Sequence, residues 1–239
     1  MNDAPRHLLN DLKFYLSRPH ECSYLPDHQA TTLFADPDSS ITTEQYDDLI
    51  QFGFRRSGSM IYRPRCASCQ ACVPVRVACS SFQANRTQRR IWKKNDDLTV
   101  VLKPGEYNDE HFALYQRYIS TRHTGGGMDD PDPGKYIDFL VGKHIDTLFV
   151  EFRHGNKLLA VAVTDVLPGA LSCVYTFFDP DESSRSPGVY SVLWQIQQAH
   201  QRQLEWCYLG YWIENCRKMA YKTQFRPIQG QINAHWRNL

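Results

Sequence analysis

Residues 147–178 read TLFVEFRHGNKLLAVAVTDVLPGALSCVYTFF, and this stretch decides the fold because three apolar runs in it are separated by two turn signals. The turn signals are His154-Gly155-Asn156-Lys157 and Pro168-Gly169, whose glycine, asparagine and proline favour the dihedral angles of tight turns. The runs between them are rich in β-branched and aromatic residues, which are enriched in strands. The pattern predicts three consecutive strands over residues 147–152, 158–166 and 171–178.

A helix and a fourth strand are predicted after these three strands. Apolar side chains recur at helical spacing between residues 188 and 204, namely Val189, Val192, Leu193, Ile196 and Ala199. Residues 205–213, centred on WCYLGYW, predict the last strand. The order strand, strand, strand, helix, strand is similar to the core of N-acetyltransferase-like (GNAT) domains. We therefore predict an α/β (α+β) fold class with a GNAT-like acyltransferase domain.

The chain before this core is predicted to form a separate module. The spacing Thr42-x-x-Gln45 is a capping box that predicts a helix to about residue 52. The other expected elements are a turn over 54–57, strands over 60–62 and 73–77, a basic helix or loop over 88–95, a helix over 106–122, a glycine-containing loop over 124–134 and a helix over 135–141. Because Pro104-Gly105 interrupts the chain, we divide it into an N-terminal cysteine-containing module, residues 1–105, and a C-terminal GNAT-like transferase domain, residues 106–239.

Length and composition predict a soluble globular protein. The chain has 239 residues, of which 42% are hydrophobic, so it can form a sizeable core. Its longest purely apolar run is the six residues from Leu158 to Val163, whereas a membrane-spanning helix needs roughly 20. The first residues, MNDAPRH, contain no apolar segment of the kind found in signal peptides. We expect no membrane partner and a cytoplasmic location.

The charges are nearly balanced in number but separated along the chain. There are 27 basic and 26 acidic residues in total. Residues 55–94 nevertheless contain ten arginines and lysines and no acid. Such a local surplus of positive charge favours a polyanionic partner, and nucleic acid is the usual one. The alternative is a basic face that only contacts solvent.

Three of the eight cysteines form the run Cys66-x2-Cys69-x2-Cys72. A short turn between two cysteines can direct both thiolates at one metal ion, whereas it suits a disulfide poorly. The ferredoxin-type pattern continues with a cysteine where this chain has Arg76, so a fourth ligand has to come from Cys22 or Cys79. Metal or cluster binding and burial as small apolar residues both remain open.

The segment before the long helix is where GNAT domains bind the pyrophosphate of coenzyme A. This chain reads Arg185-Ser186-Pro187-Gly188-Val189-Tyr190 there, and the pattern departs from a coenzyme A loop in two positions. Pro187 removes a backbone donor, and Tyr190 replaces a small residue. The sequence therefore favours an acyl donor other than coenzyme A, and no hydrolase motif is present.

Several motifs resemble those of aminoacyl-tRNA–protein transferases. In the first half they are Phe54-Arg55-Arg56-Ser57-Gly58, Tyr62-Arg63-Pro64, the cysteine run and Arg76. In the second half they are Phe178-Asp179-Pro180, Gly188-x-Tyr190-Ser191, residues 208–213 (YLGYWI), Cys216-x-Lys218-Met219-x-Tyr221-Lys222 and Phe225-Arg226-Pro227. The segments CSYLP (22–26) and ATTLF (30–34) are similar to the bacterial leucyl branch, whereas arginyl enzymes have a second cysteine in place of Leu25.

This resemblance implies transfer of leucine from leucyl-tRNA to acceptor proteins with N-terminal Asp or Glu, which marks them for degradation by the N-degron pathway. The reaction implies no required cofactor, and a zinc ion or iron–sulfur cluster held by Cys22, Cys66, Cys69 and Cys72 is the alternative. Three other functions stay open, namely an arginyl-tRNA–protein transferase, a CoA-dependent acetyltransferase and a metal-dependent nucleic-acid-binding module.

The implied reaction assigns candidate residues. An acidic acceptor calls for a cation, preferably arginine, and we expect Arg56 and Arg76 in this role. Tyr208 is the candidate catalytic residue, as a donor to the developing oxyanion. The tRNA and its aminoacyl end are expected to contact Arg89, Arg90, Tyr211, Trp212, Lys218, Lys222 and Arg226. Lys218, Lys222 and Arg226 are also alternatives to Arg56 and Arg76 as the cation that binds the acidic acceptor.

Overall fold

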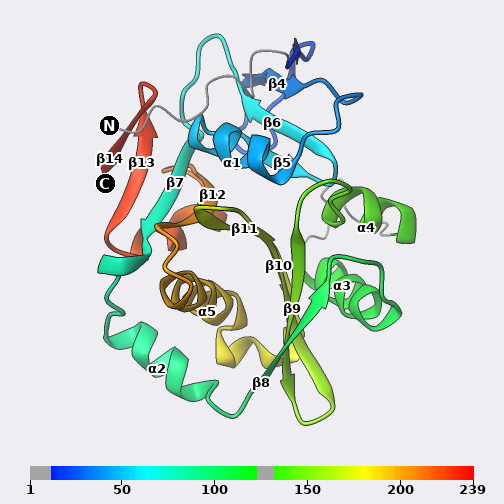
Figure 1. Cartoon of the computed structure of the whole chain (residues 1–239), viewed down its shortest axis with the longest axis vertical. Helices are drawn as coiled ribbons and strands as arrows, with labels where there is room; N and C mark the ends of the chain where they lie inside the picture. Colours follow the sequence, from blue (N-terminus) through cyan, green and yellow to red (C-terminus); the bar gives the residue numbers. More distant parts are fainter. Residues whose placement is uncertain (1–11, 123–131) are drawn as a thin grey trace.

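The protein is described by a computed structural model covering residues 12–122 and 132–239 (Figure 1). Of the predicted glycine-containing loop over 124–134, residues 124–131 lie outside these residues, and Pro133 and Gly134 begin helix α4. In chain order the elements are β1 (Phe14–Leu16), β2 (His20–Glu21), β3 (Gln29–Ala30), β4 (Thr32–Ala35), α1 (Thr43–Gln51), β5 (Arg55–Ser57), β6 (Met60–Pro64), β7 (Val73–Ala78), η2 (Cys79–Ser81), α2 (Arg86–Lys94), β8 (Thr99–Pro104), α3 (Asp109–Arg122), α4 (Pro133–Leu140), β9 (Thr147–His154), β10 (Lys157–Val166), β11 (Ala170–Phe178), η3 (Pro180–Arg185), α5 (Pro187–Gln201), β12 (Trp206–Trp212), η4 (Arg217–Gln224), β13 (Ile228–Ile232) and β14 (His235–Asn238).

A large mixed sheet organises the molecule. Its strand order is β14-β13-β7-β12-β11-β10-β9-β8, and within the described residues β11 and β12 are its only parallel pair. A four-stranded sheet, β1-β4-β6-β5, lies with α1 at one end of the molecule, and β2 and β3 form a two-stranded sheet (Figure 1). The predicted α/β fold class is confirmed.

The large sheet crosses the predicted domain boundary. Strands β7 and β8 precede residue 105, yet both belong to the same sheet as β9 to β12. The small sheet, by contrast, is formed entirely from residues 14–64. The boundary near residue 105 remains a prediction about domains, but it does not separate one sheet from the other.

Helices cover both faces of the large sheet, and successive side chains of its central strands pack against one face and then the other. Along β10, Val161 and Val163 pack with α3 and α4, whereas Ala160 and Ala162 pack on the other face with Tyr190 of α5. Successive strand residues point to opposite faces, so both faces of a central strand must be apolar when helices cover both. This is why the run from residue 158 to 163 has no polar position. The predicted strands over 147–178, the helix and the last strand are confirmed.

Two parts of the secondary structure differ from the prediction. Residues 54–57, expected to form a turn, contain strand β5, which pairs with β6. Strands β1 to β4, the edge strand β8 and the C-terminal hairpin of β13 and β14 were not predicted. These strands are short or largely exposed, so they lack the apolar alternation that marks a strand in a sequence. The capping box at Thr42 and Gln45 is confirmed in both directions.

A buried ion pair joins β5 of the small sheet to β10 of the large sheet. Arg56 Nε lies 2.8 Å from both carboxylate oxygens of Asp165, and Nη2 lies 2.6 Å from Oδ1. The remaining donors reach the Thr147 hydroxyl and the carbonyl oxygens of Gly58 and Leu140. Both side chains of the pair are 0% exposed. Arg56 thus links four segments that are distant in sequence.

Replacing Arg56 by methionine is expected to destabilise the protein by about 3–5 kcal/mol, because Asp165 stays buried without its partner. Chemical denaturation monitored by circular dichroism measures this loss. The exposed Arg65→Met variant is the control, with a change below about 0.5 kcal/mol. The double variant Arg56→Met/Asp165→Leu should recover part of the loss, and an unchanged stability of Arg56→Met contradicts the assigned role.

Candidate functional site

The candidate site lies where β11 and β12 separate. These parallel strands are paired only from Ala170↔Trp206 to Ser172↔Tyr208. Beyond this point residues 173–176 of β11 are half-buried, although β11 is a central strand of the sheet. Central strands are normally covered on both sides. The sheet is therefore least closed at this separation, next to η4 and β5.

A β-bulge at Gly210 shapes the β12 side of the site. The register of β12 against β7 shifts between Tyr208 and Gly210, and Gly210 has φ of +82°. Glycine adopts such a left-handed conformation without a steric penalty, and a bulge redirects the groups around it. The Gly210 carbonyl accepts a hydrogen bond from Arg55 Nη2 at 3.3 Å, and the next carbonyl, of Tyr211, accepts one from Lys222 Nζ at 2.6 Å. The bulge thus holds two cationic side chains.

Lys222 is placed as a buried amine. Its side chain is 8% exposed, and the Tyr211 carbonyl is its one hydrogen-bond partner within the described part of the chain. Burial, and secondly the charge of Arg55, lower the pKa of Lys222 from 10.5 to about 7, against smaller opposing effects of Cys173 and Cys216. A large fraction of Lys222 is therefore neutral near pH 7, with a lone pair that can accept a proton.

Arg76 of β7 connects Tyr208 to two tryptophans. Its guanidinium carbon lies 3.5 Å from the ring centre of Trp206 and 4.2 Å from that of Trp236. Arg76 Nη1 donates to the Tyr208 hydroxyl at 3.4 Å, and Nε and Nη2 donate to Gln229 at 3.1 and 3.0 Å. Burial raises the pKa of Tyr208, which therefore keeps its proton at neutral pH. The structure brings these two predicted residues into direct contact.

Three other predicted residues have structural partners. Arg56 uses its donors on Asp165, Thr147 and two carbonyls, so we assign it a structural role and leave it out of the proposed site. The Tyr211 hydroxyl is buried and lies 2.8 Å from the Gly53 carbonyl, just before β5, and 3.4 Å from the Tyr62 carbonyl of β6, which ties β12 to the small sheet. Trp212 packs at the edge of the core beneath α5. The polar groups of Arg56 and Tyr211 are therefore already used within the protein.

The predicted tRNA residues lie mainly on an exposed surface around α2. Arg89 and Arg90 are exposed on this helix, and Lys218 is exposed on η4. Gln88 of α2 donates to the Gln224 carbonyl at 3.0 Å, which holds the helix against the end of η4. A pocket of about 490 Å³ at this junction is lined by six residues, including Arg86 and Arg226. We call Arg86, Arg89, Arg90 and Arg226 the basic surface. Lys222, by contrast, lies inside the protein.

The cysteines predicted to hold a metal share one corner of the molecule but do not form a ligand set. Burial raises the pKa of the Cys72 thiol to about 12, and Cys22, Cys66, Cys69 and Cys216 contribute to that rise. Over residues 12–122 and 132–239, no three His, Cys, Asp or Glu side chains are grouped so that they could hold a metal ion. As placed, these residues do not fit zinc or an iron–sulfur cluster. We derive no step of the reaction through a metal.

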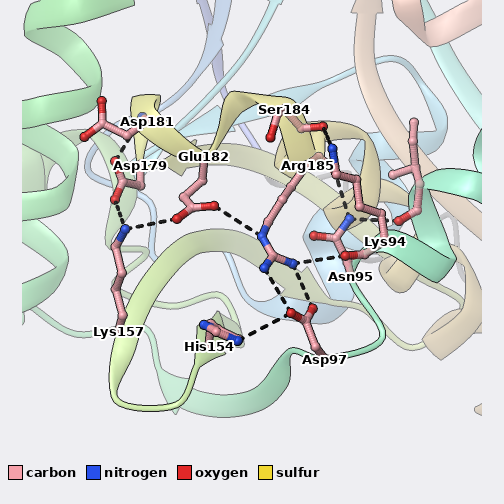
Figure 2. Close-up of polar contacts among 11 residues, drawn as sticks. Lys94, Asn95, Asp97, His154, Lys157, Asp179, Asp181, Glu182, Ser184 and Arg185 are labelled. Atoms are coloured by element: carbon pink, nitrogen blue, oxygen red, sulfur yellow. Dashed lines mark hydrogen bonds and ion pairs between the residues drawn. The ribbon is translucent and has the colours of Figure 1, made fainter.

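A network of ion pairs fills the surroundings of η3, which leads into α5 (Figure 2). Arg185 binds both oxygens of Asp97 at 2.8 and 2.9 Å and Glu182 at 3.2 Å. Lys157 binds Asp179 at 3.0 Å and Glu182 at 3.1 Å. Arg185 and Lys157 are therefore neutralised by carboxylates of the chain itself, whereas Lys94 donates to the Ser184 carbonyl.

The start of α5 offers little to a pyrophosphate. Pro187 has no N–H, and the N–H groups of Val189 and Tyr190 both donate to the Ser186 carbonyl at 3.0 Å. Tyr190 is buried against Trp92 and Phe152. Phosphate-binding helix starts need free N–H groups and positive potential. This geometry agrees with the sequence in disfavouring coenzyme A as the acyl donor.

The described part of the chain also lacks any helix of the length and apolar character that crossing a bilayer demands.

Fold and site together define an acyltransferase-like protein, in which a mixed sheet opens beside buried polar side chains instead of a coenzyme A loop. The chain belongs to the arginine-tRNA-protein transferase family, because the models of the family's N terminus and C terminus match residues 20–90 and 110–232.

The relatives it matches have a more specific name. "Aspartate/glutamate leucyltransferase" of Hahella chejuensis is 51% identical over 228 residues, which are 95% of this chain and 97% of the relative. The protein of the same name in Pseudomonas putida is 53% identical over 225 residues, 94% of this chain and 96% of the relative.

Solved structures are more distant. FemX matches with a TM-score of 0.47 and 7% identity, over 88% of this chain and 82% of its own. L-PGS from Bacillus licheniformis matches with a TM-score of 0.45 and 10% identity. The match covers 75% of this chain and 55% of the L-PGS chain.

Sequence reasoning missed the position of Arg55. It included Arg55 among the basic residues of 55–94 and in the motif over 54–58, but it assigned the acceptor role to the neighbouring Arg56. An Arg-Arg pair in a sequence carries no sign of which arginine meets a carboxylate in the fold. The glycine at 210, inside an otherwise apolar strand, was the available signal, because such a glycine often marks a bulge.

Wild-type stability is expected to increase with pH relative to Lys222→Met above about pH 7. The lowered pKa means that Lys222 takes up a proton on unfolding between pH 7 and its ordinary pKa of 10.5, so rising pH disfavours unfolding. The difference should grow by about 1 kcal/mol per pH unit. Urea denaturation at pH 7, 8 and 9 measures it, with the exposed Lys218→Met as control. If the free energy of unfolding changes with pH in the same way for wild type and Lys222→Met, the burial of a neutral lysine is contradicted.

Proposed function

We propose that this protein transfers leucine from leucyl-tRNA to the α-amino group of proteins that begin with Asp or Glu. The observation that carries the proposal is the match to leucyltransferases at 51–53% identity, which extends over nearly the full length of both proteins. The site supports it, because it contains arginine side chains for an acidic acceptor and an exposed basic surface for a nucleic acid. We further propose that the reaction occurs in the cytoplasm and marks the acceptor for degradation.

The chemistry needs placement more than strong activation. Leucyl-tRNA is an ester, and an α-amino group has a pKa of about 7.7–8.0, so part of the acceptor is neutral near pH 7. Holding amine and ester together in attack geometry can lower the barrier by about 7–11 kcal/mol. As the amine attacks, the carbonyl oxygen becomes negative and needs hydrogen-bond donors. We assign this role to the Tyr208 hydroxyl, which Arg76 orients.

The donor tRNA is proposed to bind the basic surface. The four arginines of this surface are exposed. Arg86 and Arg226 line the pocket where α2 meets the end of η4, and Arg89 and Arg90 lie further along α2. This junction adjoins Lys222, which is on η4, so a tRNA bound there has its aminoacyl end near the separation of β11 and β12. Exposed charges of one sign attract a polyanion and orient it before contact. Lys218 on the same element is an additional ligand of the tRNA end.

Arg76 is proposed to attract the acidic acceptor to the site. It is a partly exposed arginine that contacts Tyr208, and no carboxylate of the described residues pairs with it. We propose that the reaction requires no metal or other cofactor, because its electrophile is already activated in the ester.

The first test is transfer of radiolabelled leucine or arginine from charged tRNA to peptides that start with Asp, Glu, Lys or Ala. Label should move from leucyl-tRNA to the Asp and Glu peptides only, and EDTA should not change the rate. Transfer from arginyl-tRNA instead keeps the family and rejects leucine as the donor. Loss of transfer with EDTA rejects the metal-free reaction. Absence of transfer from both donors rejects the proposal.

The tRNA surface is tested by salt dependence. Neutralising Arg89 and Arg90 together by glutamine should weaken binding of leucyl-tRNA and reduce the slope of log K against log salt concentration by roughly two, since each lost phosphate contact contributes about one. Filter binding between 50 and about 250 mM salt measures this slope. The exposed Lys143→Gln, in the segment that follows α4, is the control. An unchanged slope places the tRNA elsewhere.

A further inference from the structure

Arg55 is a buried arginine whose donors are only partly used. Its side chain is 6% exposed, and Nη2 lies 3.3 Å from the carbonyl oxygens of both Val75 and Gly210. Nε and Nη1 are buried and have no hydrogen-bond partner in residues 12–122 and 132–239. No carboxylate of these residues forms an ion pair with Arg55, whereas the adjacent Arg56 is fully paired with Asp165. A buried cation without an anion is costly, so its retention calls for an explanation.

The surroundings of Arg55 do not neutralise its charge. The ring of Tyr208 lies 5.1 Å from its guanidinium carbon, and β7 and β12 supply only carbonyl oxygens. The other cationic group at this bulge is Lys222, close enough to Arg55 to be affected by its charge. Arg55 has no acid beside it and leaves this interior positive, and Lys222 adds to that charge only when it is protonated. An anion that reaches Arg55 gains Coulomb energy that water weakens little.

We propose that Arg55 is the receptor for the side-chain carboxylate of the acceptor's first residue, with Lys222 beside it to bind the α-amine. This inference rests on the proposed function and names the residues that select the acceptor. A carboxylate is the usual partner of free guanidinium N–H groups. In an N-terminal Asp or Glu the amine and the carboxylate are a few bonds apart, as Arg55 and Lys222 are held by consecutive carbonyls of β12.

Burial favours a carboxylate over a tRNA phosphate at Arg55. A nucleic-acid backbone contacts exposed cations, and the four arginines of the basic surface have that exposure. The Arg55 side chain is instead buried between the small sheet and strands β7 and β12, where an extended phosphate backbone does not reach it. Selection by charge also needs a dry site, because an exposed ion pair contributes little.

Lys222 completes the reaction by moving one proton. The α-ammonium of the acceptor gives a proton to the neutral Nζ of Lys222, which keeps one N–H on the Tyr211 carbonyl. The amine lone pair then forms the new C–N bond with the leucyl carbonyl carbon. As the tetrahedral intermediate collapses, the ester C–O bond breaks, and the ribose oxygen leaves with the second amine proton. Lys222 afterwards releases its proton to solvent.

The test compares acceptors that differ only in charge. Rates of leucine transfer to matched Asp- and Asn-starting peptides are measured for wild type, Arg55→Met and Arg76→Met. We expect Arg55→Met to lower the Asp/Asn rate ratio about tenfold or more, mainly by slowing the Asp peptide, because a polar contact is lost from a buried site. A purely structural defect slows both peptides equally and leaves the ratio unchanged. A lowered ratio in Arg76→Met alone assigns the receptor to Arg76 and overturns the inference.

Stability provides an independent readout. Arg55→Met should melt no lower than wild type, because it removes an unpaired buried charge, whereas Arg56→Met melts lower. Should Arg55→Met fail to fold, Arg55→Lys keeps a cation without the guanidinium donors, and an unchanged Asp/Asn ratio in that variant overturns the inference. If wild type transfers no leucine, the proposed function fails. In that case the receptor is tested by peptide binding alone. Asp-Ala, but not Asn-Ala, should raise the melting temperature of wild type, and the Arg55 variant should not show this shift.

Discussion

The ion pair of Arg56 with Asp165 is the interaction on which the positions of the other site residues depend. It joins β5 to β10 where neither side chain is exposed, so water cannot replace either partner. Successive residues in a strand point to opposite sides, and fixing Arg56 therefore also fixes Arg55 on the side of Tyr208 and Gly210. The paired Arg56 thus positions the neighbouring Arg55, which has no carboxylate partner among the described residues.

The protein has two kinds of basic side chain, exposed ones and buried ones. The arginines of the basic surface are exposed, and their field reaches about one Debye length, roughly 8 Å at physiological salt, which suits a large polyanion. Arg55 and Lys222 are buried, where an interaction is short in range but strong. An enzyme with a tRNA and a protein N-terminus as substrates has a use for both. The bulge at Gly210 places the buried pair beside the separation of β11 and β12.

Local patterns predicted the elements that depend on local physics. The strands over 147–178, the long helix that follows and the capped helix at Thr42 are confirmed, because turn residues, apolar periodicity and capping act over a few positions. Strand β5 was mistaken for a turn, since its arginines give no apolar signal and its pairing with β6 stabilises it. The large sheet also takes β7 and β8 from before residue 105, and pairing between distant strands leaves no mark in a single sequence.

By itself the sequence determined the fold class, the family resemblance, the segregation of basic residues and the departure from a coenzyme A loop. These properties are carried by short motifs and by composition. Only the tertiary structure decided that Arg56 is paired, that Arg55 is not, and that Lys222 lies inside the protein while Arg89 and Arg90 lie outside. The reason is physical, because the chemistry of an ionisable side chain depends on burial and partners, and both come from residues far away in the chain.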